Sequence, residues 1–346
     1  MIISVPTTNG RQIKINFKKL FFPLLIFIVV VIVIINFSEL REIGELFKKA
    51  KWYFILAAFA SQFVNFFFQA SVIRSTFRIL GFPRLKTAEF MKVGIMVFFL
   101  NFVIPSLGMA GYFNFAKVLE KYGVKIGRAA NAAVIEVICY YLAFVLVIIF
   151  SLFYLFFKLG HIGYSQIIAA GGLFLAITIL TLGISFFVKS KKASSKVLGW
   201  VANKIDYFED GVHDEKRIQE ILTDFRVEFA WIKDNKLKLA KPFGWQLMKF
   251  ITDGVTIFLI FLAFGFMPPI GLGLVAFAFG RMFGLLSFMP GGVGAFEGAM
   301  VLIFNSLGVS LELALSVMLI YRFFSYWLYF PLGLWAQRSL NRNNSN

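Results

Sequence analysis

Five charged residues lie inside long apolar runs, where a charged side chain is rare and costs about 2.5–3.5 kcal/mol at the centre of a bilayer. They are Glu136, Asp253, Arg281, Glu297 and Arg322. Arginine donates a planar fork of hydrogen bonds that suits phosphate, and a carboxylate can accept a proton or pair with a cation. These residues are therefore candidates for a polar substrate path. The alternative is a set of buried ion pairs, such as Glu136 with Arg322 and Glu297 with Arg281.

The segment 290–298 reads Pro-Gly-Gly-Val-Gly-Ala-Phe-Glu-Gly and lies between two apolar runs. Proline removes a backbone donor and glycine adds chain entropy, so a helix cannot continue through this segment. Unpaired backbone groups are tolerated at membrane depth only where they are buried in protein or line a wet cavity. A loop at the membrane surface is the alternative to a re-entrant hairpin, which we favour. The candidate path residues of the hairpin are Pro290, Gly291, Gly292 and Gly294.

A second break follows the apolar run 93–104, whose twelve residues would make a helix of about 18 Å, against roughly 30 Å of hydrocarbon. Basic residues dominate on both sides of this region, so both flanks are expected in the cytoplasm. A hairpin that enters from the cytoplasm and breaks near a proline satisfies both observations. Its candidate path residues are Asn101, Pro105 and Gly108.

The composition excludes a water-soluble domain, because 59% of the 346 residues are hydrophobic and only 15% are charged. The formal net charge of +17 is expected in cytoplasmic loops that face anionic lipid, and we expect no nucleic-acid partner. Cys139 is the single cysteine, and His161 and His213 are far apart in sequence. We therefore expect no disulfide, no metal site and no cofactor.

The apolar runs predict an all-α polytopic membrane protein with about six full transmembrane helices and two re-entrant helical hairpins. The predicted spans are about 20–37, 52–73, 129–157, 165–188, 243–266 and 311–336. The second span carries Gln62, Asn65 and Gln69 on one helical face, which should point at protein. The charge pattern places both termini and a hydrophilic hairpin at 189–241 in the cytoplasm, on the inner side of the cell membrane.

The two breaks are related in sequence. Pro105 and Pro290 are followed at similar distances by Val-Leu, by Gly-Val and by an aromatic run. We infer a repeat within a single domain, with repeat one at about 52–157 and repeat two at about 243–337. Counting the spans gives the two repeats opposite orientations, which is the arrangement of an inverted-repeat transporter.

These motifs carry a resemblance to a known family. The segments Pro-Ser-Leu-Gly at 105–108 and Pro-Gly-Gly-Val-Gly-Ala-Phe-Glu at 290–297, with Glu136 and Arg322, are similar to the lysylphosphatidylglycerol synthase transmembrane family. The resemblance covers nearly the whole chain and implies a flippase-like membrane domain. In that family's best-known members this domain is joined to a soluble aminoacyl-transferase domain. Segment 189–241 is too short for such a domain, so we expect none.

Three functions are compatible with these observations. The favoured one is movement of an anionic phospholipid or isoprenoid-linked lipid between leaflets, with membrane lipids as partners. The second is a membrane enzyme that modifies a lipid headgroup, with Glu297 or Glu136 as general base. The third is a non-catalytic subunit whose basic cytoplasmic face recruits a soluble partner.

Overall fold

The computed structural model describes residues 2–6, 12–16, 45, 47–82, 86–103, 124, 126–159, 171, 223, 235–287 and 290–342. The chain forms two compact units, Met1–Ala50 and Lys51–Asn346. The predicted spans 20–37 and 165–188 lie outside the described residues, apart from residue 171. Pro105 and Gly108 of the first break also lie outside the described residues, as does most of the predicted cytoplasmic hairpin 189–241.

The first unit contains the strands β1 (Ile2–Pro6) and β2 (Gln12–Asn16), which pair antiparallel with Ile2 opposite Asn16 and Pro6 opposite Gln12. The sequence analysis did not predict this two-stranded hairpin, which precedes the helical part of the chain. The sequence signal for it is the alternation of apolar and polar residues in Gln-Ile-Lys-Ile-Asn, which has the period of a strand.

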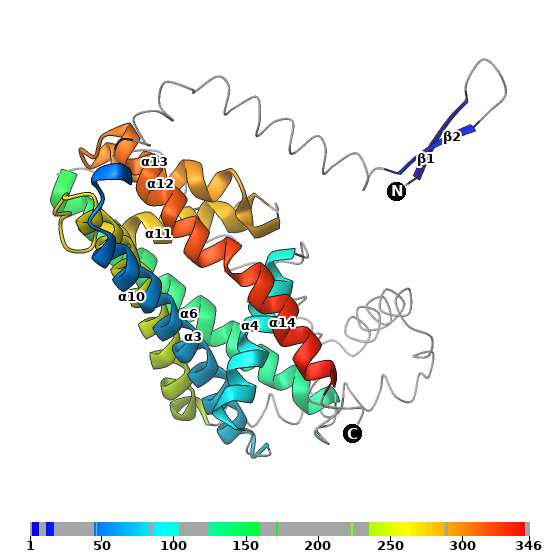
Figure 1. The fold of residues 1–346 in the computed structure, drawn as a ribbon. Coiled ribbons are helices and arrows are strands. Elements are labelled where there is room, and N and C mark those ends of the chain that lie inside the picture. Colours follow the sequence, from blue (N-terminus) through cyan, green and yellow to red (C-terminus); the bar gives the residue numbers. More distant parts are fainter. Residues whose placement is uncertain are drawn as a thin grey trace. The chain divides into compact units, whose positions relative to one another are not determined.

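The described part of the second unit is helical (Figure 1). Its elements are α3 (Trp52–Ile79), α4 (Thr87–Val103), α6 (Ile126–Leu159), η1 (Lys236–Leu239), α10 (Ala240–Ala263), α11 (Leu272–Leu286), η2 (Pro290–Gly292), α12 (Ala295–Ser306), α13 (Leu311–Arg322), η3 (Phe323–Trp327) and α14 (Tyr329–Arg342).

Four helical stretches are long and apolar enough to cross a membrane, within the described ranges. They are Trp52–Ile79, Ile135–Lys158, Lys236–Ala263 and Leu311–Leu340. These stretches confirm four of the six predicted spans. The last one is continuous through α13 and α14, although η3 is a π-helical turn immediately after Arg322. Single π-helical turns of this kind are frequent at functional sites.

Helices α3 and α10 pack against each other in antiparallel directions (Figure 1). Polar contacts follow the interface in opposite sequence order: Gln62 Nε2 donates to Thr256 Oγ1 at 2.9 Å, and Asn65 Nδ2 donates to the Lys249 carbonyl at 3.1 Å. Gln62, Asn65 and Gln69 are all buried, which confirms the predicted protein-facing side of the second span. The antiparallel packing agrees with the opposite directions predicted for these two spans.

Helices α11 and α12 are short and pack on one another, joined through the glycine-rich break. Gly292 has a φ of +68°, and a Cβ at this position would lie 2.6 Å from the Cα of Gly284 on α11. Glycine is required here for two reasons, the left-handed backbone and the close approach of the two chain segments. The break predicted from the proline and glycines is confirmed.

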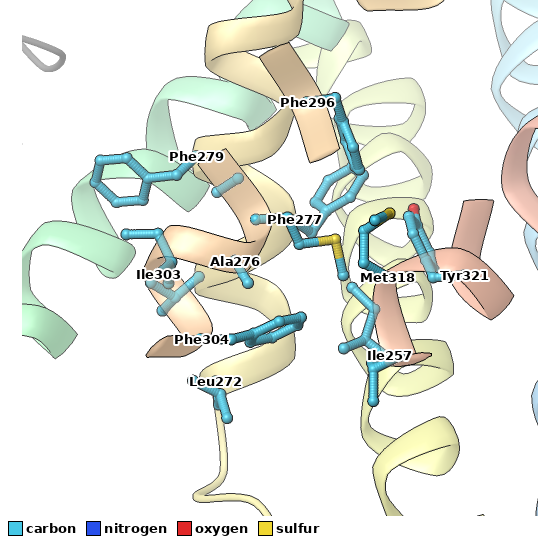
Figure 2. Close-up of a cluster of buried hydrophobic side chains, with 14 of the residues drawn as sticks. Ile257, Leu272, Ala276, Phe277, Phe279, Phe296, Ile303, Phe304, Met318 and Tyr321 are labelled. Carbon is cyan, nitrogen blue, oxygen red and sulfur yellow. The ribbon is translucent and has the colours of Figure 1, made fainter. Parts of the chain in front are cut away.

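Two apolar clusters form the interior of the second unit. One cluster surrounds α11, where Phe277 packs near Phe296 of α12 and Tyr321 of α13 (Figure 2). The other joins α3 and α4 to α14, through contacts such as Phe66 with Tyr329.

The exposed face of α6 is also apolar and carries large side chains at helical spacing. They are Leu142, Leu146, Ile149, Phe150, Phe153 and Phe157. An exposed apolar helix face of this kind is expected to contact lipid rather than water.

Candidate functional site

A small cavity of about 30 Å³ lies where the helices of the second unit converge. Its lining draws residues from α3, α4, α6, α10, α11, α12, α13, η3 and α14. The polar lining residues are Gln62, Asn65, Lys249, Asp253, Arg281, Arg322 and Ser325. The aromatic ones are Phe98, Tyr140, Phe250, Phe277, Phe296, Tyr321 and Tyr329. The cavity therefore combines charged groups with aromatic walls from both apolar clusters.

Helix α10 contributes two charged residues one helical turn apart, Lys249 and Asp253. Both are buried, with 5% and 7% of their surface exposed. The Lys249 ammonium lies 4.7 Å from the centre of the Phe98 ring, a cation–π distance. Asp253 Oδ1 accepts a 3.0 Å hydrogen bond from Tyr321 Oη. In the part of the chain that the structure describes, Lys249 forms no ion pair, so its charge remains available to a ligand.

Arg281 enters the cavity from the middle of α11. Its Nε donates a 2.8 Å hydrogen bond to Tyr140 Oη on α6, and its guanidinium lies 5.9 Å from the centre of the same ring. This contact fixes the side chain across the gap between the two helices. The charge of Arg281 acts electrostatically on both Lys249 and Asp253, so the three residues form one charged group.

Arg322 connects α13 to the glycine-rich break. Its Nε donates to Glu297 Oε1, and its Nη2 donates to the Gly291 carbonyl at 3.0 Å. The guanidinium lies 4.2 Å from the ring centre of Phe296 and 5.0 Å from that of Tyr326. Two of the five N–H donors of the guanidinium are thus used by acceptors among the described residues. The remaining donors leave capacity for a ligand in the cavity.

Glu297 lies in the first turn of α12, as the sequence predicted. Its Oε2 accepts a 2.7 Å hydrogen bond from the Gly294 amide, while its Oε1 accepts from Arg322. A carboxylate at this position satisfies a free amide of the helix start and lies at the positive end of the helix dipole. Glu297 therefore holds the break and Arg322 together rather than lining the cavity itself.

Glu136 lies on α6 outside the cavity lining. Only 2% of its surface is exposed, and its Oε1 accepts a 2.6 Å hydrogen bond from Gln69 Nε2 on α3. The predicted pairs of Glu136 with Arg322 and of Glu297 with Arg281 are wrong, because Arg322 pairs with Glu297 and Glu136 bonds to Gln69. Sequence spacing cannot give the rotation of one helix about its axis relative to another, and that rotation decides which charges meet.

The structure brings three predicted site residues into the cavity lining, namely Asp253, Arg281 and Arg322. Gly291, Gly294 and Glu297 are joined to it through Arg322, and Gly292 packs against α11. Pro290 begins η2, and Asn101 lies on α4, where only its backbone is described.

Lys249, Tyr140 and Tyr321 line the cavity but were not among the predicted site residues. For Lys249 the sequence did carry a signal. It stands four residues before Asp253, so both side chains lie on one face of the same apolar helix. The tyrosines carried none, since aromatic residues are common throughout the chain and only tertiary contacts separate these two from the rest.

The cavity lining carries three cations against one carboxylate. The cations are Lys249 of α10, Arg281 of α11 and Arg322 of α13, so three different helices supply them. Converging cations in a partly dry site favour an anion with several acceptor oxygens, and arginine forks match phosphate and carboxylate groups. The arrangement can therefore bind a phosphate-like anion while its aromatic walls accept apolar groups.

Comparison with known proteins agrees with the fold and the motifs. The family described as lysylphosphatidylglycerol synthase TM region matches residues 20–333. A UPF0104 membrane protein of Methanothermobacter thermautotrophicus is 24% identical over 171 residues, and the match spans 47% of this chain and half (50%) of that protein. A UPF0104 membrane protein of Methanocaldococcus jannaschii is 22% identical over 344 residues, which are 96% of this chain and 98% of that protein. The chain is a multi-pass membrane protein that belongs to the lysylphosphatidylglycerol synthase transmembrane-region family.

Proposed function

We propose that this protein moves the headgroup of an anionic, phosphate-bearing lipid through the membrane, from one leaflet to the other. The observation that carries the proposal is the convergence of Lys249, Arg281 and Arg322 on one cavity at the meeting point of the helices. A lipid headgroup must leave water to cross the bilayer, and fixed cations lower the cost of that step for an anion.

The arrangement of elements supports transport through an inverted repeat. The starts of α4 and α11 are 185 residues apart, and so are the starts of α6 and α13. Pro105 and Pro290 have the same separation of 185 residues. Helices α3 and α10 are equivalent in this alignment and run antiparallel, as two repeats of opposite orientation require.

We further propose that α11 and α12 form a re-entrant hairpin. Neither helix is long enough to cross the hydrocarbon, since they contain 15 and 12 residues. In the break between them, the Gly291 carbonyl accepts a hydrogen bond from Arg322. The non-helical backbone would therefore lie inside the protein rather than against lipid. The hairpin would open toward the outside, with both chain termini in the cytoplasm.

The cavity is narrow in this conformation. Its volume of about 30 Å³ admits only a few water molecules at roughly 10–15 Å³ each, so a headgroup needs it to widen. Arg322 is tied to Glu297 and to the Gly291 carbonyl, and those contacts hold the hairpin against α13. We propose that the hairpin moves relative to α13 to open the cavity to one side of the membrane at a time.

Reconstitution into lipid vesicles tests this function. Fluorescent phosphatidylglycerol and phosphatidylcholine are placed in both leaflets, and a quencher that cannot cross the membrane reports which labels reach the outer leaflet. We expect faster movement of the anionic lipid than in protein-free vesicles, and a smaller effect on the zwitterionic one. Arg281→Gln should remove most of the increase, while the exposed control Arg338→Gln should retain it.

Analysis of the lipids after the assay separates transport from catalysis. Unchanged lipid masses together with accelerated movement support transport. A new lipid species would instead support the headgroup-modifying enzyme, and equal rates with and without protein would contradict the proposed function.

A further inference from the structure

Glu136 is a buried carboxylate for which headgroup binding in the cavity provides no role, because it does not line the cavity. Among the described residues, the hydrogen bond that Glu136 accepts comes from a neutral amide, Gln69 Nε2 at 2.6 Å. An amide can orient a carboxylate but cannot balance its charge. A buried ionised carboxylate without a close cation is costly, so something else must compensate it.

Helices α3, α10 and α11 pack against α6 and determine what faces Glu136. Helix α3 presents Gln69, and α10 presents Lys249, whose charge acts on Glu136 without forming an ion pair. Helix α11 presents Arg281, whose Nε donates a hydrogen bond to Tyr140 Oη. Tyr140 lies one helical turn after Glu136 on α6. Within the described ranges, Lys249 is the cation whose charge acts on Glu136, and it acts more strongly on Asp253.

The internal repeat places a second carboxylate at a related position. Gln69 and Asp253 are 184 residues apart, and Glu136 and Tyr321 are 185 residues apart. The hydrogen bond from Gln69 to Glu136 thus corresponds to the hydrogen bond from Tyr321 to Asp253. Lys249 acts electrostatically on both carboxylates. Each repeat therefore supplies one buried acid with a neutral hydrogen-bond partner, and both acids share one lysine.

Six described charged residues lie in the cavity lining or directly behind it, and their charges balance. Asp253, Lys249, Arg281 and Arg322 line the cavity, while Glu136 and Glu297 lie behind the lining. When all six are ionised their sum is zero, so an anionic headgroup would leave excess negative charge in a desolvated region. Excess charge of this kind is expensive, and uptake of one proton removes it.

We propose that Glu136 binds a proton when an anionic headgroup enters the cavity, so that the headgroup and the proton cross the membrane together. This inference rests on the proposed function and adds its energy source. The headgroup and Glu136 compete for Lys249, a lining cation that forms no ion pair with a described residue.

The proposed cycle needs no covalent step. The Lys249 ammonium turns to the headgroup phosphate, and Glu136 loses its compensating cation. A proton from the aqueous phase then binds the Glu136 carboxylate at the oxygen that Gln69 does not bond. When the headgroup leaves on the opposite side, Lys249 returns and Glu136 releases the proton there.

An imposed pH gradient across proteoliposomes tests the coupling. Because headgroup and proton move together, labelled phosphatidylglycerol should accumulate in the leaflet that faces the more alkaline solution. Reversing the gradient should reverse the accumulation. Glu136→Gln keeps the shape and the acceptor for Gln69, so this variant should still equilibrate the lipid but lose the accumulation. Glu312→Gln at the start of α13 is the control and should behave as wild type.

Proton uptake on binding gives a second readout without transport. Short-chain phosphatidylglycerol is added to the detergent-solubilised protein in weak buffer with a pH-sensitive dye. Wild type should take up a proton for each headgroup bound, and Glu136→Gln should bind without uptake.

The outcomes separate the two proposals. The coupling is overturned if the pH gradient has no effect on lipid movement in wild type, or if Glu136→Gln still accumulates lipid under the gradient. Either result leaves the proposed function intact. Absence of both binding and lipid movement in wild type overturns the anionic-lipid site and the coupling with it.

Discussion

At the scale of single residues, Arg322 links the glycine-rich break to α13. It pairs with Glu297, donates to the Gly291 carbonyl and stacks on Phe296. Replacement by lysine keeps the charge but loses the planar fork, so the two contacts cannot both be kept with the same geometry. We expect Arg322→Lys to abolish most lipid movement and to lower stability by about 1–3 kcal/mol.

Vesicle assays and thermal unfolding in detergent measure the two effects. Arg338→Lys on the exposed side of α14 is the matched control and should change neither. Wild-type transport and an unchanged melting temperature in Arg322→Lys would show that neither lipid movement nor stability requires the guanidinium fork.

At the scale of elements, the hairpin of α11 and α12 depends on the backbone of its break. Gly292 combines a left-handed φ of +68° with contact against Gly284. Gly292→Ala should strain the backbone and push the two segments apart, which we expect to reduce folded yield and transport together.

Gly298→Ala is the control for this change. Gly298 lies on the exposed side of α12, and a Cβ there would meet nothing within 4 Å. Alanine is the better helix former, so this variant should be neutral or slightly more stable. Equal behaviour of the two variants in size-exclusion chromatography and thermal unfolding would show that the close approach at Gly292 is not required.

The interface of α3 and α10 is held by buried polar contacts around Thr256. Its hydroxyl accepts from Gln62 and shares a 2.6 Å hydrogen bond with Ser61. Thr256→Val would leave the Gln62 amide buried and unpaired, which we expect to cost about 1–3 kcal/mol. Thr252→Val is the control, because among the described residues the Thr252 hydroxyl bonds only to the Met248 carbonyl of its own helix. A melting temperature that falls no further in Thr256→Val than in Thr252→Val would contradict this expectation.

The sequence predicted elements better than contacts. The break at 290–294, the first-turn position of Glu297 and the buried face of Gln62, Asn65 and Gln69 all follow from local rules on proline, glycine and helical spacing. The partners of Glu136 and Arg322 depend on how whole helices rotate and pack, and no local rule supplies that rotation. Lys249 could be predicted only from its spacing of four residues from Asp253, which places both charges on one face of an apolar helix.

At the scale of the whole molecule, we expect the two ends of α10 to face opposite sides of the membrane, with its start in the cytoplasm. Leu237 and Ile270 lie near the two ends of this helix and are 92% and 87% exposed. In a Cys139→Ser background, a cysteine at Ile270 should react with a membrane-impermeant reagent added outside cells. A cysteine at Leu237 should react only after the membrane is opened.

The Cys139→Ser protein without a new cysteine is the control and should stay unlabelled. Labelling of the Leu237 variant from outside in intact cells would contradict the cytoplasmic position expected from the basic residues around it.

The proposed function requires an anionic headgroup to pass through the cavity where Lys249, Arg281 and Arg322 converge. We test this with Lys249→Met, because methionine keeps much of the side-chain volume and removes a lining cation that forms no ion pair with a described residue. Loss of a hydrogen bond to a charged group weakens binding by about 1.5–3 kcal/mol, or roughly tenfold or more.

The measurement is the initial rate of phosphatidylglycerol movement in vesicles that contain equal amounts of folded wild type, Lys249→Met or Lys236→Met. Lys236 lies just before α10 and is exposed, so its variant controls for the loss of one positive charge. We expect a rate at least about tenfold lower for Lys249→Met and an unchanged rate for Lys236→Met. Equal rates in all three proteins would contradict it.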